Sequence, residues 1–581
     1  MLKRNEKLIK SKFLQYLVPS VMMTMALQLG NIVDTMIVGN ILGADAMSAV
    51  KIGMTLDNIV EIPGYVLGVG GSVAAGILLG KRNREKADRV FSATLAVSVI
   101  FGVIFALLSF TSPAIAAFLT GGSSLSGDVE KFVFVTLLGA PVLSLALQFM
   151  NYVAVDNNPT IASVYVIMAN VINLTLDVIL LKFTSVGTAG AALSTVLGYG
   201  ISLVVLIKYI KSPKRMLKFV NPFKDFASVI GLALKTGIPT LLYMIFITIK
   251  DYSINIIVVS LIGNDAMAIY TVCCNVILLS ELLIGGITAT LSSIGEVIYG
   301  EKDFYGIRVL CKNVLMFSYA VLSVLLIILV AFPSVTLKLF GITDSSMLLL
   351  AQTSLRIFVF CLPFYVINKF FTIFYQVTEK TALSGIITSL QNCIAVVPLA
   401  FLFIFIAKKS NPDAMLNALM FSFIASEILT FLLSHLYRMI RYRRMGILIL
   451  PKGREENTLD ISIKPEINEA CALSHEIMEF CDGLIPRQKA NLIAVAAEEM
   501  AVNIIKYGGK KSKSIDINLC ITDDTVMLRT RDNGIPFDPS DYTFDSDEFE
   551  IHGIEVIKKI TDNIHYLRVL DLNNTVIEIK R

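Results

Sequence analysis

Long apolar runs separated by short polar breaks constrain the fold of this chain more than any other feature. They continue to about Arg444, and beyond that point the composition is that of an ordinary water-soluble domain. Of the 581 residues, 55% are hydrophobic and 17% are charged, which is more apolar surface than a soluble core requires. About twelve runs are long enough to cross the roughly 30 Å hydrocarbon core of a bilayer as helices. They begin near residues 14, 54, 90, 132, 160, 188, 229, 267, 313, 346, 382 and 415. We therefore expect an all-α polytopic membrane protein followed by a soluble domain.

The positions of the lysines and arginines predict the orientation of the chain. Four segments are rich in these residues, and they fall on one side of the membrane if each run crosses once: residues 1–12, 81–89, 208–224 and 438–444. Basic loops stay in the cytoplasm. We therefore expect a multi-pass protein of the plasma (cytoplasmic) membrane, or cell inner membrane, with both termini in the cytoplasm. Lys408 and Lys409 fall on the other side and are an exception.

Three further features exclude some classes of protein. The net charge of +4 is too small to suggest binding to nucleic acid. The eight cysteines form neither a CxxC pair nor a metal-ligand spacing, so we expect them to be reduced. The basic amino terminus leads into an apolar run that is too long for a signal-peptide core, so we expect no cleavage.

The membrane part consists of two related halves. One offset relates the segments 41–49 and 261–269, the turns 80–83 and 300–303, Pro19 and Pro239, and Glu61 and Glu281. A chance similarity between apolar segments would not keep the same offset for turns, charged residues and prolines. Six spans repeated in one orientation give two parallel bundles, which is the architecture of alternating-access carriers. We expect two six-helix lobes, a linker and a soluble domain at residues 1–225, 226–444, 445–458 and 459–581.

One acidic residue, Asp34, lies in the middle of the first apolar run. A charge at the centre of a bilayer helix costs about 3 kcal/mol to insert, and such a residue commonly carries an ion, a proton or a substrate. Asn173 and Asp177 are four residues apart and share one helix face, and Thr195 lies in the next run. With Asp34 they could form a polar cage for H⁺, or for Na⁺ held by carboxylate and amide oxygens. Alternatively, neighbouring helices merely cap Asp34, and Asn173 and Thr195 make ordinary interhelical hydrogen bonds.

These features resemble the MATE (multidrug and toxic compound extrusion) transporters. The resemblance covers about the first 440 residues and rests on the repeat and on the stretches NIVDTMIVGNILGADAMSAV, GVGGSVAAGILLGKRNREKA, NVINLTLDVIL and AGAALSTVLGYG. It implies export of drugs or other small organic molecules by a V-shaped pair of six-helix lobes, coupled to H⁺ or Na⁺. It also implies a cation site formed by Asp34, Asn173, Asp177 and Thr195, with Pro19 as the hinge proline of the first helix.

The second lobe departs from the family pattern. The stretch after Pro239 lacks the acid that some members carry there, and the tenth span has Arg356 and Lys369 in place of an acid. We therefore place no cation site in this lobe. Lys369 is a candidate for lining a central cavity. Glu61 and Glu281 either line it as well or lie near a membrane face, where they would cap or snorkel. The mixture of charges leaves the charge preference for substrates open.

The residues from Leu459 onward predict a two-layer α+β sandwich of about 120 residues. Apolar spacing predicts helices at 466–481, 486–507 and 551–560. Alternation predicts strands at DISIKP, SIDINLCI, TVMLRTR, 564–570 and 575–580.

Two short motifs carry the chemistry of this domain. In EEMAVNIIKYG, Glu499 and Asn503 lie one turn apart on one helix face, and RDNGIPFDP places Asp532 at the start of a turn. An asparagine oxygen suits Mg²⁺ beside phosphates, and a buried aspartate can accept the exocyclic amine of adenine. The chain contains no GxxxxGK[ST] motif, which excludes a P-loop engine.

In this order the motifs resemble the GHKL ATPase domain of anti-sigma serine kinases and histidine kinases. The resemblance implies binding of ATP with Mg²⁺, and it assigns Glu499 as the base and Asn503 as the Mg²⁺ ligand. It also implies nucleotide contacts from Asp532, Gly534, Gly553 and Thr575. Two positions depart from the family, because Tyr507 replaces a basic residue and Ile551 replaces a glycine. We expect nucleotide binding, and the turnover of ATP stays open.

Three functions agree with these features. The first is a cation-coupled exporter of small organic molecules, embedded in the lipid bilayer, with a cytoplasmic nucleotide-binding regulatory domain. The second is a transporter-like membrane sensor that controls a serine/threonine kinase acting on a small phosphoacceptor regulatory protein. The third is a flippase for lipid precursors.

Overall fold

A computed structural model describes nine stretches of the chain, which are residues 4–120, 125–212, 215–339, 345–411, 414–443, 448–450, 457–509, 514–541 and 553–580. The chain divides into two compact units. The membrane unit comprises residues 15–300 and 311–449. The soluble unit comprises residues 1–14, 301–310 and 450–581, so it combines the carboxyl-terminal domain with two short segments from earlier in the chain.

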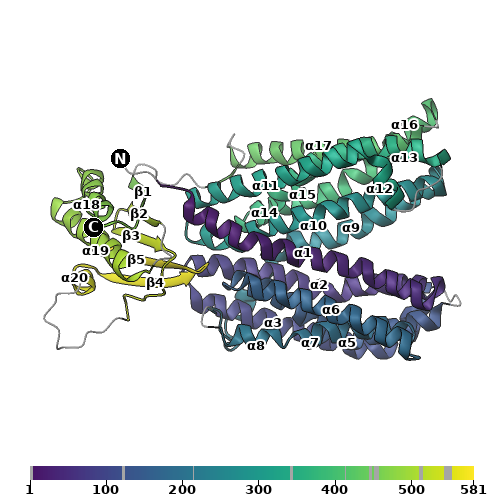
Figure 1. The fold of residues 1–581 in the computed structure, drawn as a ribbon, viewed down its shortest axis with the longest axis horizontal. Helices are drawn as coiled ribbons and strands as arrows, with labels where there is room; N and C mark the ends of the chain where they lie inside the picture. Colours follow the sequence, from purple (N-terminus) through teal and green to yellow (C-terminus); the bar gives the residue numbers. More distant parts are fainter. Residues whose placement is uncertain are drawn as a thin grey trace. The chain divides into compact units, whose positions relative to one another are not determined.

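Long helices build the membrane unit in two bundles, drawn from purple to blue and from teal to green in Figure 1. The amino-terminal lobe contains α1 (Lys7–Leu42), α2 (Ala44–Gly80), α3 (Arg84–Leu108), η1 (Ser109–Thr111), α4 (Ser112–Thr120), α5 (Ser126–Val155), α6 (Pro159–Phe183), α7 (Thr188–Ser202) and α8 (Val205–Ile210). The carboxyl-terminal lobe contains α9 (Phe226–Leu261), α10 (Asn264–Gly300), α11 (Phe304–Ala331), α12 (Pro333–Leu339), α13 (Ser345–Phe358), η2 (Val359–Cys361), α14 (Leu362–Val377), α15 (Thr381–Ser389), η3 (Leu390–Ile394), α16 (Val396–Ser410) and α17 (Met415–Tyr442).

Twelve of the described segments are long and apolar enough to cross a membrane, which confirms the predicted architecture. Several spans are broken rather than continuous. The third, sixth, tenth and eleventh spans each consist of two helices, and a π-helical turn, η3, joins α15 to α16 in the eleventh. π-Helical turns inside membrane helices commonly mark functional positions.

The sequence repeat corresponds to repeated backbone geometry. Gly43 and Gly263 end the first helix of each lobe with φ of 92° and 120°, where only glycine is free of steric strain. Arg82 and Lys302 take positive φ of 59° and 61° in the two later turns. The two lobes are therefore built from the same helix–turn–helix units, and α2 packs against α9 and α10 where they meet.

The carboxyl-terminal domain is a two-layer sandwich, as predicted. Its antiparallel sheet has the order β1-β2-β3-β5-β4, with β1 (Thr458–Ile463), β2 (Ile515–Ile521), β3 (Thr525–Asp532), β4 (Asn563–Val569) and β5 (Leu572–Lys580). The helices α18 (Ile467–Cys481), α19 (Arg487–Tyr507) and α20 (Gly553–Ile560) pack on one face through aliphatic side chains. Side chains alternate between the faces of a sheet, so the polar residues between those aliphatic ones point to the opposite face.

Candidate functional sites

The first candidate site is a cage of polar side chains inside the amino-terminal lobe. Asp34 of α1 and Asp177 of α6 are buried, and their carboxyl groups interact with each other. The Ser194 hydroxyl of α7 donates to Asp177 Oδ1. Asn173 Nδ2 donates to Ser194 Oγ at 3.3 Å and to Thr195 Oγ1 at 3.1 Å. The structure thus brings together the four residues that the sequence singled out, and it adds Ser194.

Close packing of two helices builds this cage. Gly198 lies one turn after Ser194 on α7, and a Cβ atom there would lie 2.8 Å from Ala169 O and 2.9 Å from Asn173 Cβ of α6. Glycine therefore lets α7 approach α6 closely enough for Ser194 and Thr195 to meet Asn173. Pro19 lies inside α1, just over four turns before Asp34, where it removes one helical hydrogen bond.

Two oxygens of the cage stay available for a ligand. In the part of the chain that the structure describes, Asp34 Oδ1 and Asp177 Oδ2 are buried and have no hydrogen-bond partner. Buried polar atoms without partners are costly and are normally satisfied by water, a proton or an ion. Two adjoining carboxylates can share one proton, or they can hold Na⁺ together with the neighbouring amide and hydroxyl oxygens.

A second group of acids in this lobe lies on α2. Asp57 hydrogen-bonds with the hydroxyl of Thr136, and Glu61 lies one turn further along the same helix. Sequence reasoning singled out Glu61 but missed Asp57, although the argument used for Asp34 applies equally to an acid inside the second apolar run. The two acids add further carboxyl groups to the amino-terminal lobe outside the cage.

In the carboxyl-terminal lobe, two acids have hydrogen-bond donors from neighbouring helices. Glu281 of α10 accepts hydrogen bonds from the hydroxyl of Tyr365 and from Lys369 Nζ, the latter at 3.2 Å. Glu427 of α17 is buried and accepts from Asn368 Nδ2 at 2.8 Å and from Gln391 Nε2 at 3.1 Å. Glu61 and Glu281 are related by the repeat, but only Glu281 has an ion-pair partner among the described residues.

Sequence reasoning missed Glu427 and also Glu296, which is buried on α10 and accepts a hydrogen bond from Ser292. Both are acids inside apolar runs, so hydropathy alone marks them. Their hydrogen-bond donors come partly from other helices, as with Asn368 and Gln391 for Glu427, and the sequence does not indicate that partnership.

In the soluble domain, one face of the sheet carries the predicted nucleotide contacts. Asp532 Oδ1 at the end of β3 accepts hydrogen bonds from Gly534 N at 2.6 Å and from Asn573 Nδ2 at 3.0 Å. Burial raises the pKa of this carboxyl, and the two donors act in the opposite direction. Thr575 lies two residues after Asn573 on β5, so its side chain points to the same face of the sheet.

The helix α19 brings the other predicted residues of this site. Glu499 and Asn503 lie one turn apart on it, and Asn503 Nδ2 is buried with no partner among the described residues. This buried unpaired amide, together with the Asp532 carboxyl, fits a polar ligand such as nucleotide. Gly553 begins α20. Ile551, the predicted departure from the family, lies outside the described residues.

The opposite face of the same sheet carries a cluster of four charges, which we call the arginine cluster: Arg4, Glu301, Asp303 and Arg531. Arg4 Nη1 and Nη2 bind both oxygens of Asp303 at 2.8 and 2.6 Å. Arg531 Nη1 donates to Asp303 Oδ2 at 2.7 Å, and its Nη2 donates to Glu301. Their side chains are 2–7% exposed, so these charges are nearly removed from solvent. All four belong to the soluble unit.

Electrostatics within this cluster are strong. Burial alone would raise the pKa of Asp303, but Arg4 and Arg531 together hold it well below its usual range. Asn574 of β5 adds a hydrogen bond from its Nδ2 to Glu301 Oε1 at 2.6 Å. Arg531 and Asn574 are the immediate neighbours of Asp532 and Asn573, so the cluster and the predicted nucleotide contacts share two strands.

Twelve spanning segments in two repeated lobes, with polar sites buried inside each lobe, define a two-lobed membrane carrier. The MatE family model matches residues 19–179 and 239–402, which together are more than half of the chain. The chain therefore belongs to the MATE family of membrane transporters of small molecules. A model for the histidine kinase-like ATPase domain matches residues 465–580, so the transporter is fused to such a domain.

Two relatives have names that refer to drugs. "Probable multidrug resistance protein YoeA" of Bacillus subtilis (strain 168) is 24% identical over 357 residues, covering 59% of this chain and 75% of that protein. "Multidrug export protein MepA" of Staphylococcus haemolyticus (strain JCSC1435) is 24% identical over 377 residues, covering 64% of this chain and 81% of that protein.

Solved structures share the fold of the membrane part. A MOP superfamily transporter from Pyrococcus furiosus superposes with a TM-score of 0.68 at 18% identity, covering 77% of this chain and 99% of that chain. An outward-facing multidrug resistance MATE transporter of the same superfamily gives a TM-score of 0.67 at 19% identity, covering 76% and 99%. At these identities the likeness concerns the fold alone.

Proposed function

We propose that this protein exports small organic molecules across the cytoplasmic membrane in exchange for H⁺ or Na⁺. The observation that carries the proposal is the cage of Asp34, Asn173, Asp177, Ser194 and Thr195, in which two buried carboxyl oxygens have no partner among the described residues. The name of the Staphylococcus haemolyticus relative, a multidrug export protein, supports export as the direction of transport, and the other relative is named for multidrug resistance.

A cation bound in the cage can change the relative stability of different arrangements of the helices. Its carboxylates come from α1 and α6, and its hydroxyl groups come from α7. Two adjoining carboxylates repel each other when both are ionised, and a bound cation or a shared proton removes that repulsion. Cation binding therefore favours whichever state of the lobe brings α1 nearer to α6, by no more than the difference in cation affinity between the states.

The test is gradient-driven export in proteoliposomes that contain the purified full chain. A pH gradient and a Na⁺ gradient are imposed separately, and export is followed by fluorescence with an anionic dye, carboxyfluorescein, and a cationic dye, ethidium, in parallel. We expect one of the gradients to drive export, and Asp34→Asn to abolish it without preventing insertion of the protein. Asp128→Asn is the matched control, because this exposed acid near the start of α5 pairs only weakly with Lys131. Normal gradient-driven export by Asp34→Asn would refute the proposal.

The soluble domain, in this proposal, binds ATP with Mg²⁺ and regulates export from the cytoplasm rather than powering it. The arginine cluster supports a regulatory role, because it joins the strands of the predicted nucleotide site to Glu301 and Asp303. These residues form the turn between α10 and α11, and Glu301 directly follows the last residue of α10. A change at Asp532 and Asn573 can reach that turn through their neighbours Arg531 and Asn574.

Two measurements on the full chain distinguish a domain that regulates export from a domain that powers it. Calorimetry should detect Mg-ATP binding that weakens by about tenfold or more in Asn503→Ala and Asp532→Asn, because each removes a buried polar contact worth about 1–3 kcal/mol. In energised vesicles, Asn503→Ala should change the rate of export or its dependence on ATP while export continues. Export that survives full dissipation of the ion gradients, and stops in Asn503→Ala, would make the domain the engine.

A variant outside the nucleotide site tests the route between the domain and the helices. Arg531→Met removes the guanidinium that binds Glu301 and Asp303 but leaves Asp532 and Asn573 in place. We expect it to bind Mg-ATP as the wild type does and to lose the effect of ATP on the rate of export. If ATP still changes the rate in this variant, the regulatory signal takes another route.

A further inference from the structure

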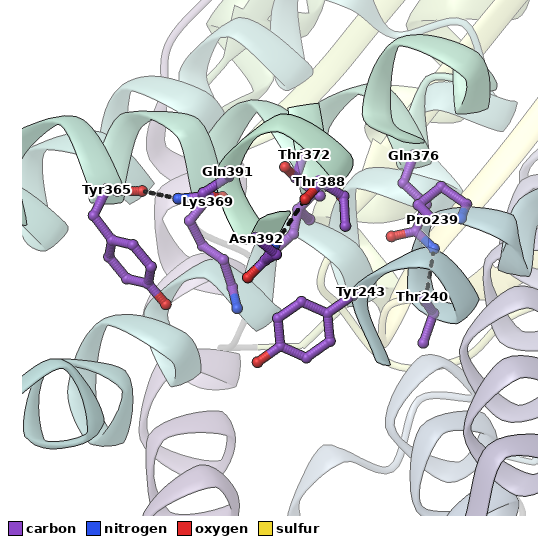
Figure 2. Close-up of a pocket in the computed structure, with 11 residues that line it drawn as sticks. Pro239, Thr240, Tyr243, Tyr365, Lys369, Thr372, Gln376, Thr388, Gln391 and Asn392 are labelled. Carbon is purple, nitrogen blue, oxygen red and sulfur yellow. Dashed lines mark hydrogen bonds between the residues drawn. The ribbon is translucent and has the colours of Figure 1, made fainter. Parts of the chain in front are cut away.

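A cavity of about 170 Å³ lies inside the carboxyl-terminal lobe, between α9, α14, α15 and the π-helical turn η3. Figure 2 shows the side chains of Lys369, Tyr243 and Asn392 directed toward a common space. Lys369 is the one lysine, arginine or acid among the lining residues of this cavity. Glu281 and Glu427, the acids nearest to it in the hydrogen-bond network, do not line it.

The ammonium group of Lys369 has unused hydrogen-bonding capacity. It carries three N–H donors. Among the described residues, the structure gives it one acceptor, Glu281 Oε2 at 3.2 Å. The ring of Tyr243 lies 5.5 Å from Lys369 Nζ, so an aromatic face also borders the charge. A ligand in the cavity can therefore meet a positive charge with free donors beside an aromatic ring.

The two acids nearest to Lys369 in the hydrogen-bond network already have donors of their own. Glu281 receives the hydroxyl of Tyr365 and the ammonium of Lys369, and Glu427 receives amide groups from Asn368 and Gln391. A cationic ligand would have to displace Lys369 or break into the Glu427 network. An anionic ligand needs only to share an ammonium that still has donors available.

Polar side chains of α15 and η3 add further contacts for a ligand. Thr388 Oγ1 is buried and has no hydrogen-bond partner in the part of the chain that the structure describes. The π-helical turn begins two residues later and presents two consecutive side chains, Gln391 and Asn392, to the cavity. An ordinary helical turn separates consecutive side chains by about 100°, so the wider turn helps both of them to line one space.

We propose that this cavity is the binding site of an organic anion, in which the carboxylate or a similar acidic group pairs with Lys369. The aromatic or aliphatic body of the ligand packs against Tyr243, Tyr365 and Ile373, and Thr388 supplies a further polar contact. The inference rests on the proposed function as an exporter and names the chemical class of its substrate. Lys369 is then the residue that determines specificity for charge.

Binding of three probes that share one ring system tests this assignment: naphthoate, naphthylmethylammonium and naphthamide. The full chain is purified in detergent without any ion gradient, and binding is measured by calorimetry. We expect naphthoate to bind at least about tenfold more tightly than the other two, as for a single desolvated charge pair. Lys369→Met should remove this preference, and Lys369→Arg should retain most of it because the charge is kept.

Two further variants keep the test decisive. Lys250→Met is the matched control, since this lysine of α9 pairs with Asp251 at 3.4 Å and does not line the cavity. If Lys369→Met alone fails to fold, the double variant Glu281→Gln/Lys369→Met removes the charge together with its partner. A wild type that binds naphthoate no more tightly than the cation, or a naphthoate preference that survives loss of Lys369, overturns the proposal.

The same purified protein and its Asp34→Asn variant distinguish a failure of this inference from a failure of the proposed function. Asp34→Asn should keep the preference for naphthoate and lose gradient-driven export, because the cage and the cavity lie in different lobes. If Asp34→Asn exports normally, the coupling proposal fails and the anion site stands. If export depends on Asp34 but the naphthoate preference is absent, the anion site fails and the coupling proposal stands.

Discussion

In the amino-terminal lobe, Asp34 and Asp177 face each other, and the structure pairs neither with a basic side chain in the residues it describes. In the carboxyl-terminal lobe, Glu281 is paired with Lys369. The lobes share one repeated helix–turn–helix geometry, including the positive φ of Gly43 and Gly263. A buried acid that carries its own countercharge has little to gain from an external cation. This difference is the basis of our two proposals, a coupling cation in the first lobe and an organic anion in the second.

The matching turns 80–83 and 300–303 also differ in the partners of their equivalent residues. Asn83 caps its own helix by accepting a hydrogen bond from Lys86 N at 3.1 Å. The equivalent residue of the second lobe, Asp303, makes the local bond to Gly306 N at 2.8 Å and in addition binds Arg4 and Arg531. The turn therefore only caps a helix in the first lobe, whereas its repeat in the second lobe belongs to the soluble unit.

The largest expected effect would come from neutralising an acid of the cage. Asp177→Asn should reduce gradient-driven export to the rate of vesicles without protein, because the amide cannot exchange a proton or neutralise a cation. Glu281→Gln should leave the dependence on the gradient in place, even if the rate changes. The measurement is export from proteoliposomes, under an imposed gradient, of whichever of the two dyes the wild type transports. Equal losses in the two variants would remove the proposed distinction between the lobes.

The second prediction concerns the two matching turns, 80–83 and 300–303. Asp303→Asn leaves two buried guanidinium groups short of countercharge, and we expect it to lower the free energy of unfolding of the soluble unit by about 3 kcal/mol. Asn83→Ala, the matching change in the first lobe, should cost about 1 kcal/mol, as for loss of a helix cap. Hydrogen exchange of the amides of β3 and β5 in the full chain, and of α3 for the control, measures both. A cost for Asp303→Asn no greater than that for Asn83→Ala would show that the arginine cluster adds no stability.

The stabilising effect of Asp303 should depend on pH in a defined direction. Its pKa in the folded chain is lowered, so its contribution is complete above the unfolded value of about 3.9 and is lost as the pH falls toward the folded value. The difference in unfolding free energy between wild type and Asp303→Asn should be constant from about pH 8 to pH 5 and shrink below about pH 4. A difference that grows on acidification would contradict the ion-pair assignment.

The smallest expected effect concerns the stability of the second lobe. Glu281→Gln leaves the ammonium of Lys369 without its countercharge, and we expect a loss of about 2 kcal/mol, reduced from a fully buried pair because the two side chains are 17–24% exposed. Asp34→Asn should not destabilise the protein, because it removes a buried charge that has no cationic partner. Thermal unfolding in detergent compares the two variants, and Glu281→Gln/Lys369→Met should recover most of the loss. If Asp34→Asn alone destabilises the protein, Asp34 must have a cationic partner, and the proposed difference between the lobes is wrong.

Hydropathy and spacing in the sequence predicted much of the fold of this protein. The twelve spans, the repeat through Pro19 and Pro239, and the order of strands and helices after Leu459 all follow from local patterns, because the bilayer and the core each select apolar residues with a fixed period. The motifs that contain Asp34, Asp177 and Asp532 were visible for the same reason. A single acid in an apolar run, or a DNG turn after a strand, is a local signal.

Only the tertiary structure decided which side chains meet. The sequence singled out Thr195 but not Ser194, and the packing of α7 against α6 brings the hydroxyl of Ser194 to Asp177 and that of Thr195 to Asn173. The pairing of Lys369 with Glu281 and the meeting of Arg531 with Asp303 join residues 88 and 228 positions apart. Such contacts depend on helix crossings and on a strand register that no local pattern encodes. Whether a buried charge has a partner is therefore decided by the fold.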